Sequence, residues 1–208
     1  MFLTVLGSGT SVPHPRRSSS AYWLETASGT VLLDCSPSAI QQMAELRLDW
    51  AGLDAIWISH FHLDHFGGLA PYLFGIKHAA ETRGRTSPLR IFGGRGLDAL
   101  IRDIDAAGGY RLLEQRFAIE IVEVGELEPF EILPGVEAVA KKTPHTDASH
   151  AIHIRDGEAT MVFTADTGFD TSITGLAGGV GLFVLECSFV RDKPVELHLE
   201  LAEAMHLI

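Results

Sequence analysis

Four side chains that can bind metal ions fall within six residues of this chain: His60, His62, Asp64 and His65. His60 and His62 alternate, so on an extended segment both imidazoles point to the same side. Asp64 and His65 are neighbours, and a chain that turns from strand into helix can direct them to a second point close by. Imidazoles suit zinc, manganese or iron, and a carboxylate helps to hold a second ion. The spacing predicts a two-metal site rather than a histidine-rich turn without ligands.

The flanking segments place this cluster on a loop between a strand and a helix. Residues 55–58 are apolar throughout and are bounded by turn residues, which is typical of a buried strand. Residues 67–80 carry apolar side chains at helical intervals, with Pro71 in the first turn, and predict a helix. Loops at the ends of strands are where rigid scaffolds usually present reactive groups.

A second candidate arrangement lies near the end of the chain. The apolar run 180–185 predicts a central strand that ends at Glu186. A buried, unpaired carboxylate would be costly, so Glu186 needs a partner, and His198 is the candidate. After it, residues 195–208 predict a helix with Leu197, Leu201, Met205 and Ile208 along one face.

The motifs of the chain resemble those of the metallo-β-lactamase superfamily of hydrolases, and within it those of ribonuclease Z, the tRNA 3′-end nuclease. The pattern His60-x-His62-x-Asp64-His65 resembles the superfamily's metal-binding signature. The remaining motifs are similar to those of ribonuclease Z and follow in the same order. They are Val5–Pro13 with Arg16 or Arg17 after it, Leu33-Asp34-Cys35, Thr164–Gly168 and Leu185–Phe189.

This resemblance implies a complete set of site residues and two divalent metal ions, zinc in the first place, with manganese or iron as alternatives. The first ion would have the ligands His60, His62 and His145, and the second Asp64, His65 and Asp166, with Asp166 shared between both. Asp64 would accept a proton from the attacking water, and His198, oriented by Glu186, would protonate the leaving oxygen. His150 and His153 match positions that the family fills with residues other than ligands, so we expect them to be structural.

The implied fold class is α/β: a four-layer αβ/βα metallo-β-lactamase sandwich of two packed mixed β-sheets with outer helices. We expect residues 1–208 to form a single domain of this fold. In the family, a last strand carries one more histidine ligand, which nothing here matches. We therefore expect the domain to lack its last strand and helix at the C-terminus.

Composition and charge limit the kinds of molecule that we expect this protein to bind. The formal net charge is −11, whereas proteins that grip nucleic acid usually present basic surface. A local basic patch that faces RNA is still one possible interpretation, with Arg16 and Arg17 after the first strand and a second basic group further on. A plain solvated loop is an equal alternative for these charges. The second group comprises Lys77, Arg83, Arg85, Arg90 and Arg95.

The two cysteines, Cys35 and Cys187, are expected to be buried free thiols, as in a cytoplasmic protein. No apolar run approaches the ~20 residues that span a bilayer, and no signal peptide is recognisable, so we expect no membrane partner. Relatives are often dimers, which makes a homodimer an open expectation.

The function that these features favour is hydrolysis of phosphodiester bonds with a metal-activated hydroxide, in an enzyme similar to ribonuclease Z. His145 and Asp166 are only about twenty residues apart, which leaves no room for the long arm with which that family clamps tRNA. We therefore expect an armless phosphodiesterase acting on small anionic esters, with RNA as a further substrate. The alternatives are a tRNA 3′-processing endoribonuclease proper, a thioester, lactone or sulfate-ester hydrolase, and a non-catalytic scaffold.

Overall fold

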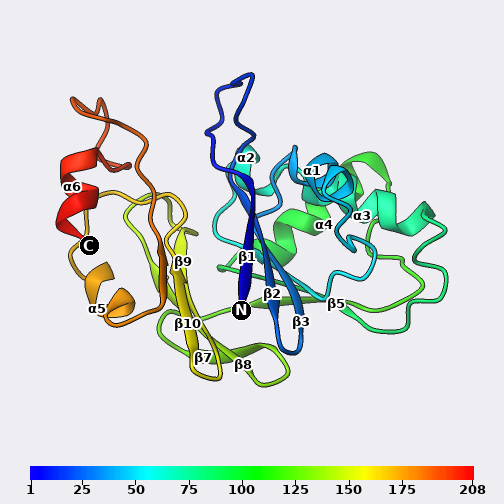
Figure 1. Cartoon of the computed structure of the whole chain (residues 1–208). Helices are drawn as coiled ribbons and strands as arrows, with labels where there is room; N and C mark the ends of the chain where they lie inside the picture. The colour runs from blue at the N-terminus through cyan, green and yellow to red at the C-terminus, as the bar shows by residue number, and fades with distance from the viewer. The chain divides into compact units, whose positions relative to one another are not determined.

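The computed structural model describes residues 1–208 (Figure 1). The chain divides into two units, Met1–Glu123 and Val124–Ile208. The first unit is built on a six-stranded mixed sheet. The strands follow one another across the sheet in chain order, antiparallel from β1 to β3 and parallel from β3 to β6. They are β1 Phe2–Gly7, β2 Ala21–Thr26, β3 Gly29–Leu33, β4 Ala55–Ile58, β5 Leu89–Gly93 and β6 Ile119–Glu123. The helices of this unit are α1 Ala39–Glu45, α2 Leu63–Phe66, α3 Leu69–His78 and α4 Leu97–Gly108.

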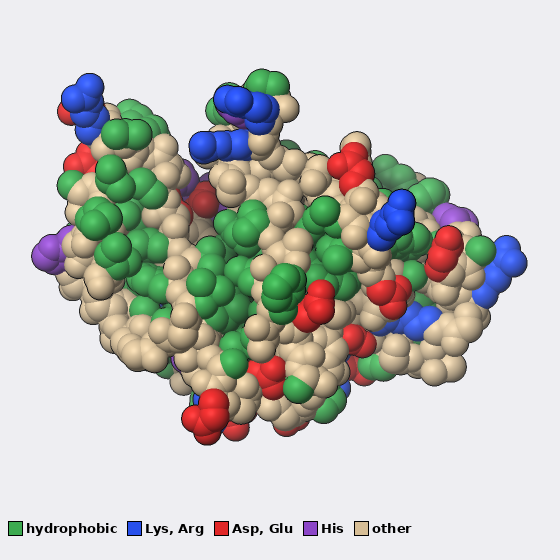
Figure 2. All heavy atoms as spheres, viewed as in Figure 1, with side chains coloured by type: hydrophobic (Ala, Val, Ile, Leu, Met, Phe, Trp, Pro, Cys, Tyr) green, Lys and Arg blue, Asp and Glu red, His purple; other side chains and the backbone are tan.

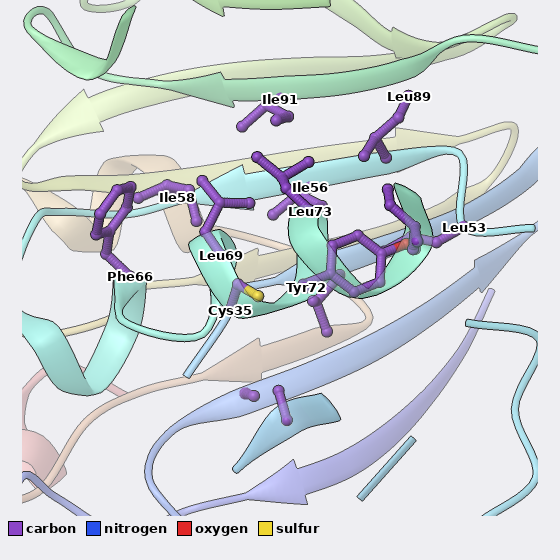
Figure 3. Close-up of a cluster of buried hydrophobic side chains, with 14 of the residues drawn as sticks. Cys35, Leu53, Ile56, Ile58, Phe66, Leu69, Tyr72, Leu73, Leu89 and Ile91 are labelled. Carbon is purple, nitrogen blue, oxygen red and sulfur yellow. The ribbon is translucent and has the colours of Figure 1, made fainter. Parts of the chain in front are cut away.

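Strand β4 has the bounds that its apolar sequence predicts, and all four of its residues are fully buried. In Figure 3, Ile56 and Ile58 of β4 point toward Leu69, Tyr72 and other apolar side chains of α3. Burial of such side chains removes apolar surface from water, at about 25 cal/mol for each Å². This packing fixes the end of β4, and with it the start of the histidine loop.

The predicted helix 67–80 is present as α3, Leu69–His78, and a separate short helix, α2, precedes it, with Gly67 and Gly68 between the two. The backbone passes very close to another segment here, because a Cβ atom on Gly68 would meet the Ser36 carbonyl oxygen at 2.2 Å. Gly68 N–H also donates to the Cys35 carbonyl at 2.8 Å. The glycine pair therefore brings the histidine loop against the residues that follow β3.

A five-stranded sheet forms the second unit, in the order β11-β10-β9-β8-β7. Its strands are antiparallel except for the parallel pair β10 and β11. The elements of this unit are β7 Pro129–Leu133, β8 Val136–Lys142, β9 His150–Asp156, β10 Ala159–Phe163, α5 Ile173–Ala177, β11 Leu182–Val184 and α6 Leu201–His206.

Two expectations for this unit are wrong. The apolar run 180–185 yields the edge strand β11, not a central strand, and Leu182 is exposed. The predicted helix 195–208 is limited to α6, which begins after Glu200, where the Glu200 N–H donates to the Glu203 side chain. The predicted apolar face is in fact exposed, at Leu197, Leu201, Met205 and Ile208, whereas Leu199, Ala204 and Leu207 are buried.

The two cysteines are free, as expected, and Cys35 is buried. Cys187 is exposed, contrary to the expectation, because it follows the short edge strand β11 in a loop. None of the helices is both long enough and apolar enough to cross a lipid bilayer.

Candidate metal centre

Asp34 is the buried residue that organises the histidine loop of the first unit. Strands β3 and β4 are parallel and pair Leu33 with Trp57, so the residues that follow them emerge side by side. Ser59 donates its N–H to Asp34 Oδ1 at 2.8 Å and its hydroxyl to Asp34 Oδ2 at 2.9 Å. His65 Nδ1 lies 2.6 Å from the same Oδ2. One fully buried carboxylate thus joins the end of β4 to the start of α2.

These contacts assign the tautomers of two histidines. The Asp34 carboxylate accepts, so His65 Nδ1 carries the hydrogen and Nε2 carries the lone pair. The Ser59 hydroxyl hydrogen is committed to Asp34, so the Ser59 oxygen accepts from His60 Nδ1 at 3.0 Å. Nε2 of His60 then also carries a lone pair. This is the arrangement in which proteins present imidazoles to metal ions.

The four predicted ligands of the first unit lie together. The ring of His60 is 4.7 Å from that of His62 and 4.3 Å from that of His65, between centroids. Asp64 Oδ2 is 3.6 Å from His65 Nε2. His60 and His65 are buried, whereas His62 is exposed, so the cluster reaches from the interior to the surface.

The second unit has a matching group around His145, which follows β8. His145 is buried, and its Nδ1 donates to the Leu197 carbonyl at 2.9 Å, which again leaves the lone pair on Nε2. That Nε2 lies 3.7 Å from Oδ2 of Asp166, the residue predicted to bridge two ions. The Thr143 hydroxyl donates to the Asp166 backbone carbonyl at 3.1 Å. The loops after β8 and β10 are therefore linked at the point where both place a predicted ligand.

Glu186 lies beside this group and contacts His198, as the sequence predicts. Glu186 Oε1 is 3.0 Å from His198 Nδ1 and accepts the Thr167 N–H at 2.7 Å. Its Oε2 accepts the Ser188 hydroxyl at 2.7 Å. Asp166, Glu186 and His198 each offer a ligand atom, and these atoms lie within 4.8 Å of one another. Glu186 therefore fixes the His198 ring next to Asp166.

The donor set fits divalent cations. In the pairs His65–Asp64 and His145–Asp166, an imidazole lone pair faces a carboxylate oxygen at 3.6 and 3.7 Å. These separations exceed hydrogen-bond length. Two ligands held about 2.0–2.2 Å from one tetrahedral ion lie roughly 3.3–3.6 Å apart. Each pair therefore has the chemistry and the approximate spacing of two ligands on one ion.

Sequence reasoning did not assign roles to Asp34, Thr167 or Ser188, although each lies within a motif that supported the resemblance. It also assigned none to Ser59, which directly precedes the histidine motif. The role of Asp34 could have been predicted from its position, because it is an acidic residue at the end of an apolar strand, as is Glu186. Burial of such a carboxylate requires partners.

The second basic group does not form an open patch. Arg85 donates to four backbone carbonyls and lies over the Phe117 ring, and Arg90 pairs with Glu120 at 3.2 Å. Lys77 donates to the Arg111 carbonyl. These contacts commit three of the five charges to the protein itself and disfavour an RNA-binding role for the group.

The fold and the histidine and carboxylate clusters define the class of protein. The family model of the metallo-β-lactamase superfamily matches residues 14–188, and the chain belongs to this superfamily. The crystal structure of YhfI from Bacillus subtilis, a metallo-β-lactamase fold protein, is similar to this chain, with a TM-score of 0.80 at 24% identity. The match covers 99% of this chain and 79% of the YhfI chain. Human tRNase Z, short form, matches equally well, with a TM-score of 0.80 at 20% identity over 99% of this chain and 86% of that chain. The expected α/β fold of two mixed sheets with helices is confirmed.

Sequence relatives point to one branch of the superfamily. Ribonuclease Z of Methanosarcina acetivorans is 30% identical over 149 residues, which are 71% of this chain and 46% of the relative. The probable metallo-hydrolase YhfI of Bacillus subtilis is 25% identical over 193 residues, 93% of this chain and 75% of the relative. The chain thus spans about half the length of the archaeal ribonuclease Z relatives that it matches. The expected resemblance to ribonuclease Z is confirmed.

Proposed function

We propose that this chain is a metal-dependent phosphodiesterase, similar to ribonuclease Z, that acts on small phosphodiesters. The proposed ligands are His60, His62 and His145 for one ion and Asp64, His65 and Asp166 for the other, with Asp166 shared. The observation that carries the proposal is the pair of lone-pair contacts, His65 Nε2 to Asp64 and His145 Nε2 to Asp166. In both, the opposite ring nitrogen donates to an acceptor within the protein.

Zinc is the first choice of ion, because a set of imidazoles and carboxylates suits it, with manganese and iron as alternatives. When bound, the ions would supply Lewis-acid activation of a water molecule and of the phosphate. The chain's own residues then have separate tasks. Asp64 is less buried than His65 and accepts a proton from the attacking water. His198, fixed by Glu186 through Nδ1, delivers a proton from Nε2 to the leaving oxygen.

The preference for small substrates rests on the segment between His145 and Asp166. It contains only the hairpin of β9 and β10, as the sequence predicts, and offers no arm for gripping a tRNA. The net charge of −11 also disfavours a large polyanion. A second candidate, tRNA 3′-end processing, is favoured by the ribonuclease Z relatives.

The test is an assay of the purified protein with bis-p-nitrophenyl phosphate, a pre-tRNA and a panel of thioesters, with and without zinc or manganese. Turnover of the phosphodiester without cleavage of pre-tRNA would support the proposal. Cleavage of pre-tRNA would favour the second candidate, and turnover of thioesters alone would refute both.

A matched pair of variants separates metal catalysis from contamination. His62→Ala should abolish turnover and weaken zinc binding in a competition titration. His78→Ala is the control, because His78 is also exposed but lies at the end of α3 against Phe74. Equal rates for His62→Ala and the wild-type protein would remove metal catalysis from consideration.

A further inference from the structure

The segment 188–199 of the second unit, which we call the His198 loop, is closed at its base by backbone hydrogen bonds (Figure 1). The Phe189 N–H donates to the Leu199 carbonyl at 3.2 Å. The Leu201 N–H donates in turn to the Phe189 carbonyl at 2.9 Å. His198 directly precedes Leu199, so the closed base of the loop holds the backbone that carries the His198 ring.

The base of the His198 loop shares a small apolar core with α6. The buried members of this core are Leu199, Ala204 and Leu207, with Leu185 packed against them. Leu185 directly precedes Glu186 in the sequence. Leu199 directly follows His198. The packing of this core therefore sets the backbone at both members of the Glu186–His198 pair. Because a helix as short as α6 is marginally stable on its own, further contacts are needed to keep it in place.

Lys193 supplies such a contact from the outer part of the loop. Its Nζ donates to Oε1 of Glu203, in the first turn of α6, at 2.7 Å. The other oxygen of the same carboxylate, Glu203 Oε2, accepts the Glu200 N–H at 3.1 Å. Glu196 also lies 3.0 Å from Lys193 Nζ, but its side chain is 90% exposed. The Lys193–Glu203 ion pair therefore links the outer part of the loop to the start of the helix.

The Lys193 side chain is directed into the protein, whereas the residues before it lie in solvent. It is 8% exposed, compared with 86% for Arg191 and 92% for Asp192. Figure 2 shows basic and acidic side chains that project from the tip of this loop. Asp192 has a left-handed φ of 56°, a conformation that persists in residues other than glycine where the surrounding structure fixes it. Since a nearly buried ammonium group requires a partner, the ion pair with Glu203 is the contact that fixes this part of the loop.

We propose that Lys193 and Glu203 are a positioning pair for His198. Their ion pair holds the His198 loop on α6, and α6 keeps the small apolar core packed beside the 3.0 Å contact between Glu186 and His198. Neither side chain contacts the substrate in this proposal. It rests on the proposed phosphodiesterase function, in which His198 delivers a proton to the leaving oxygen.

The first measurement is independent of catalysis. Amide hydrogen exchange of the full chain is compared for the wild type, Lys193→Met and the control Arg191→Met. The first variant removes the charge but keeps an unbranched side chain, and Arg191 belongs to the same loop but is 86% exposed. The N–H groups of Phe189 and Leu201, which close the loop, should exchange about tenfold faster in Lys193→Met alone. Unchanged exchange in β9 verifies that the variants are folded. Unchanged exchange at Phe189 and Leu201 would overturn the proposal.

The second measurement uses the dependence of the rate on the leaving group. Two esters of thymidine 5′-phosphate are compared, one that releases p-nitrophenolate and one that releases the 3′-oxygen of a second thymidine. Proton delivery matters chiefly for the dinucleotide, because an alkoxide is a far stronger base than p-nitrophenolate. Lys193→Met and Glu203→Gln should each lower kcat on the dinucleotide about tenfold more than on the p-nitrophenyl ester, with little change in KM. The double variant should lose no more than either single variant, because both remove the same ion pair.

The outcomes separate this proposal from the proposed function. An equal loss of kcat on both esters would assign the pair a purely structural role and overturn the proposal, as would unchanged rates. Absence of phosphodiester turnover by the wild type would instead refute the proposed function. Faster exchange at Phe189 and Leu201 in Lys193→Met would then still support the ion pair as the contact that holds the His198 loop.

Discussion

Replacement of Asp34 by Asn tests whether a buried carboxylate sets the metal-binding form of the histidine loop. Asp34 has a φ of 62°, a left-handed conformation that Asn also tolerates, so the backbone should be preserved. The carboxylate accepts three hydrogen bonds, two from Ser59 and one from His65. An amide has only one oxygen, and its NH₂ group must face at least one of these donors. The least disruptive solution moves the His65 hydrogen to Nε2, the atom proposed to bind metal.

Two magnitudes follow from these contacts. Loss of a hydrogen bond to a charged group lowers the free energy of unfolding by about 1.5–3 kcal/mol. Changes to groups that orient metal ligands typically reduce metal affinity or activity by about 10–100-fold. We therefore expect Asp34→Asn to unfold at lower urea concentration and to bind zinc about 10–100-fold more weakly in competition with a chromophoric chelator.

Asp54→Asn is the matched control, because Asp54 also lies in a loop and its carboxylate also accepts a backbone N–H group of the sheet. Its Oδ2 accepts the Thr30 N–H at 2.9 Å, away from the histidine loop. This variant should lose stability but keep zinc affinity. Unchanged zinc binding by Asp34→Asn, or equal losses in the two variants, would refute the assignment of His65 Nε2 as a ligand atom oriented by Asp34.

Three other outcomes are expected. Glu186→Gln should lower kcat on a phosphodiester by about 100-fold with little change in KM, because His198 loses the partner that orients it, and an unchanged kcat would contradict this role. Arg85→Ala should lower the free energy of unfolding by about 3 kcal/mol, because four hydrogen bonds to backbone carbonyls are lost, and an unchanged urea midpoint would argue against this clamp. Burial lowers the pKa of His150 in the folded protein, so below about pH 6.5 this histidine is protonated in the unfolded chain before it is protonated in the folded one. The free energy of unfolding therefore decreases as the pH falls below about 6.5. In metal-free urea titrations at several pH values, His150→Gln should show a shallower loss than the wild type, and equal slopes would contradict the assignment.

Local patterns predicted the elements that carry most of the candidate ligands. Residues 55–58 have the apolar run of a buried strand, and the structure has β4 over the same residues. The hairpin between His145 and Asp166 also follows from its own sequence. The partners of Asp34 could not be predicted in the same way, since they depend on the pairing of β3 with β4 over a long separation in sequence.

The end of the chain shows why periodicity alone fails there. Residues 195–208 have apolar side chains at helical spacing, yet only α6 is helical. The Leu197 carbonyl accepts from His145, and the Leu199 carbonyl accepts the N–H groups of Ser188 and Phe189. The carbonyls of Leu197 and Leu199 are thus paired with distant segments instead of with a helical turn, and the helix begins only after Glu200.

His145 is proposed as a metal ligand and His150 is expected to be structural, and the surroundings of the two rings differ in one respect. Both are buried, and in both Nδ1 lies near a backbone carbonyl, Leu197 for His145 and Ala148 for His150. Only His145 has a carboxylate oxygen facing Nε2, that of Asp166 at 3.7 Å. An imidazole lone pair that faces an anion is unfavourable unless a proton or a cation lies between them, whereas a neutral buried ring without such a neighbour has no need of either. The same criterion selects His65 with Asp64. The position of the carboxylate around the second ring nitrogen, more than the number of histidines in the motif, is therefore the feature that points to a metal centre.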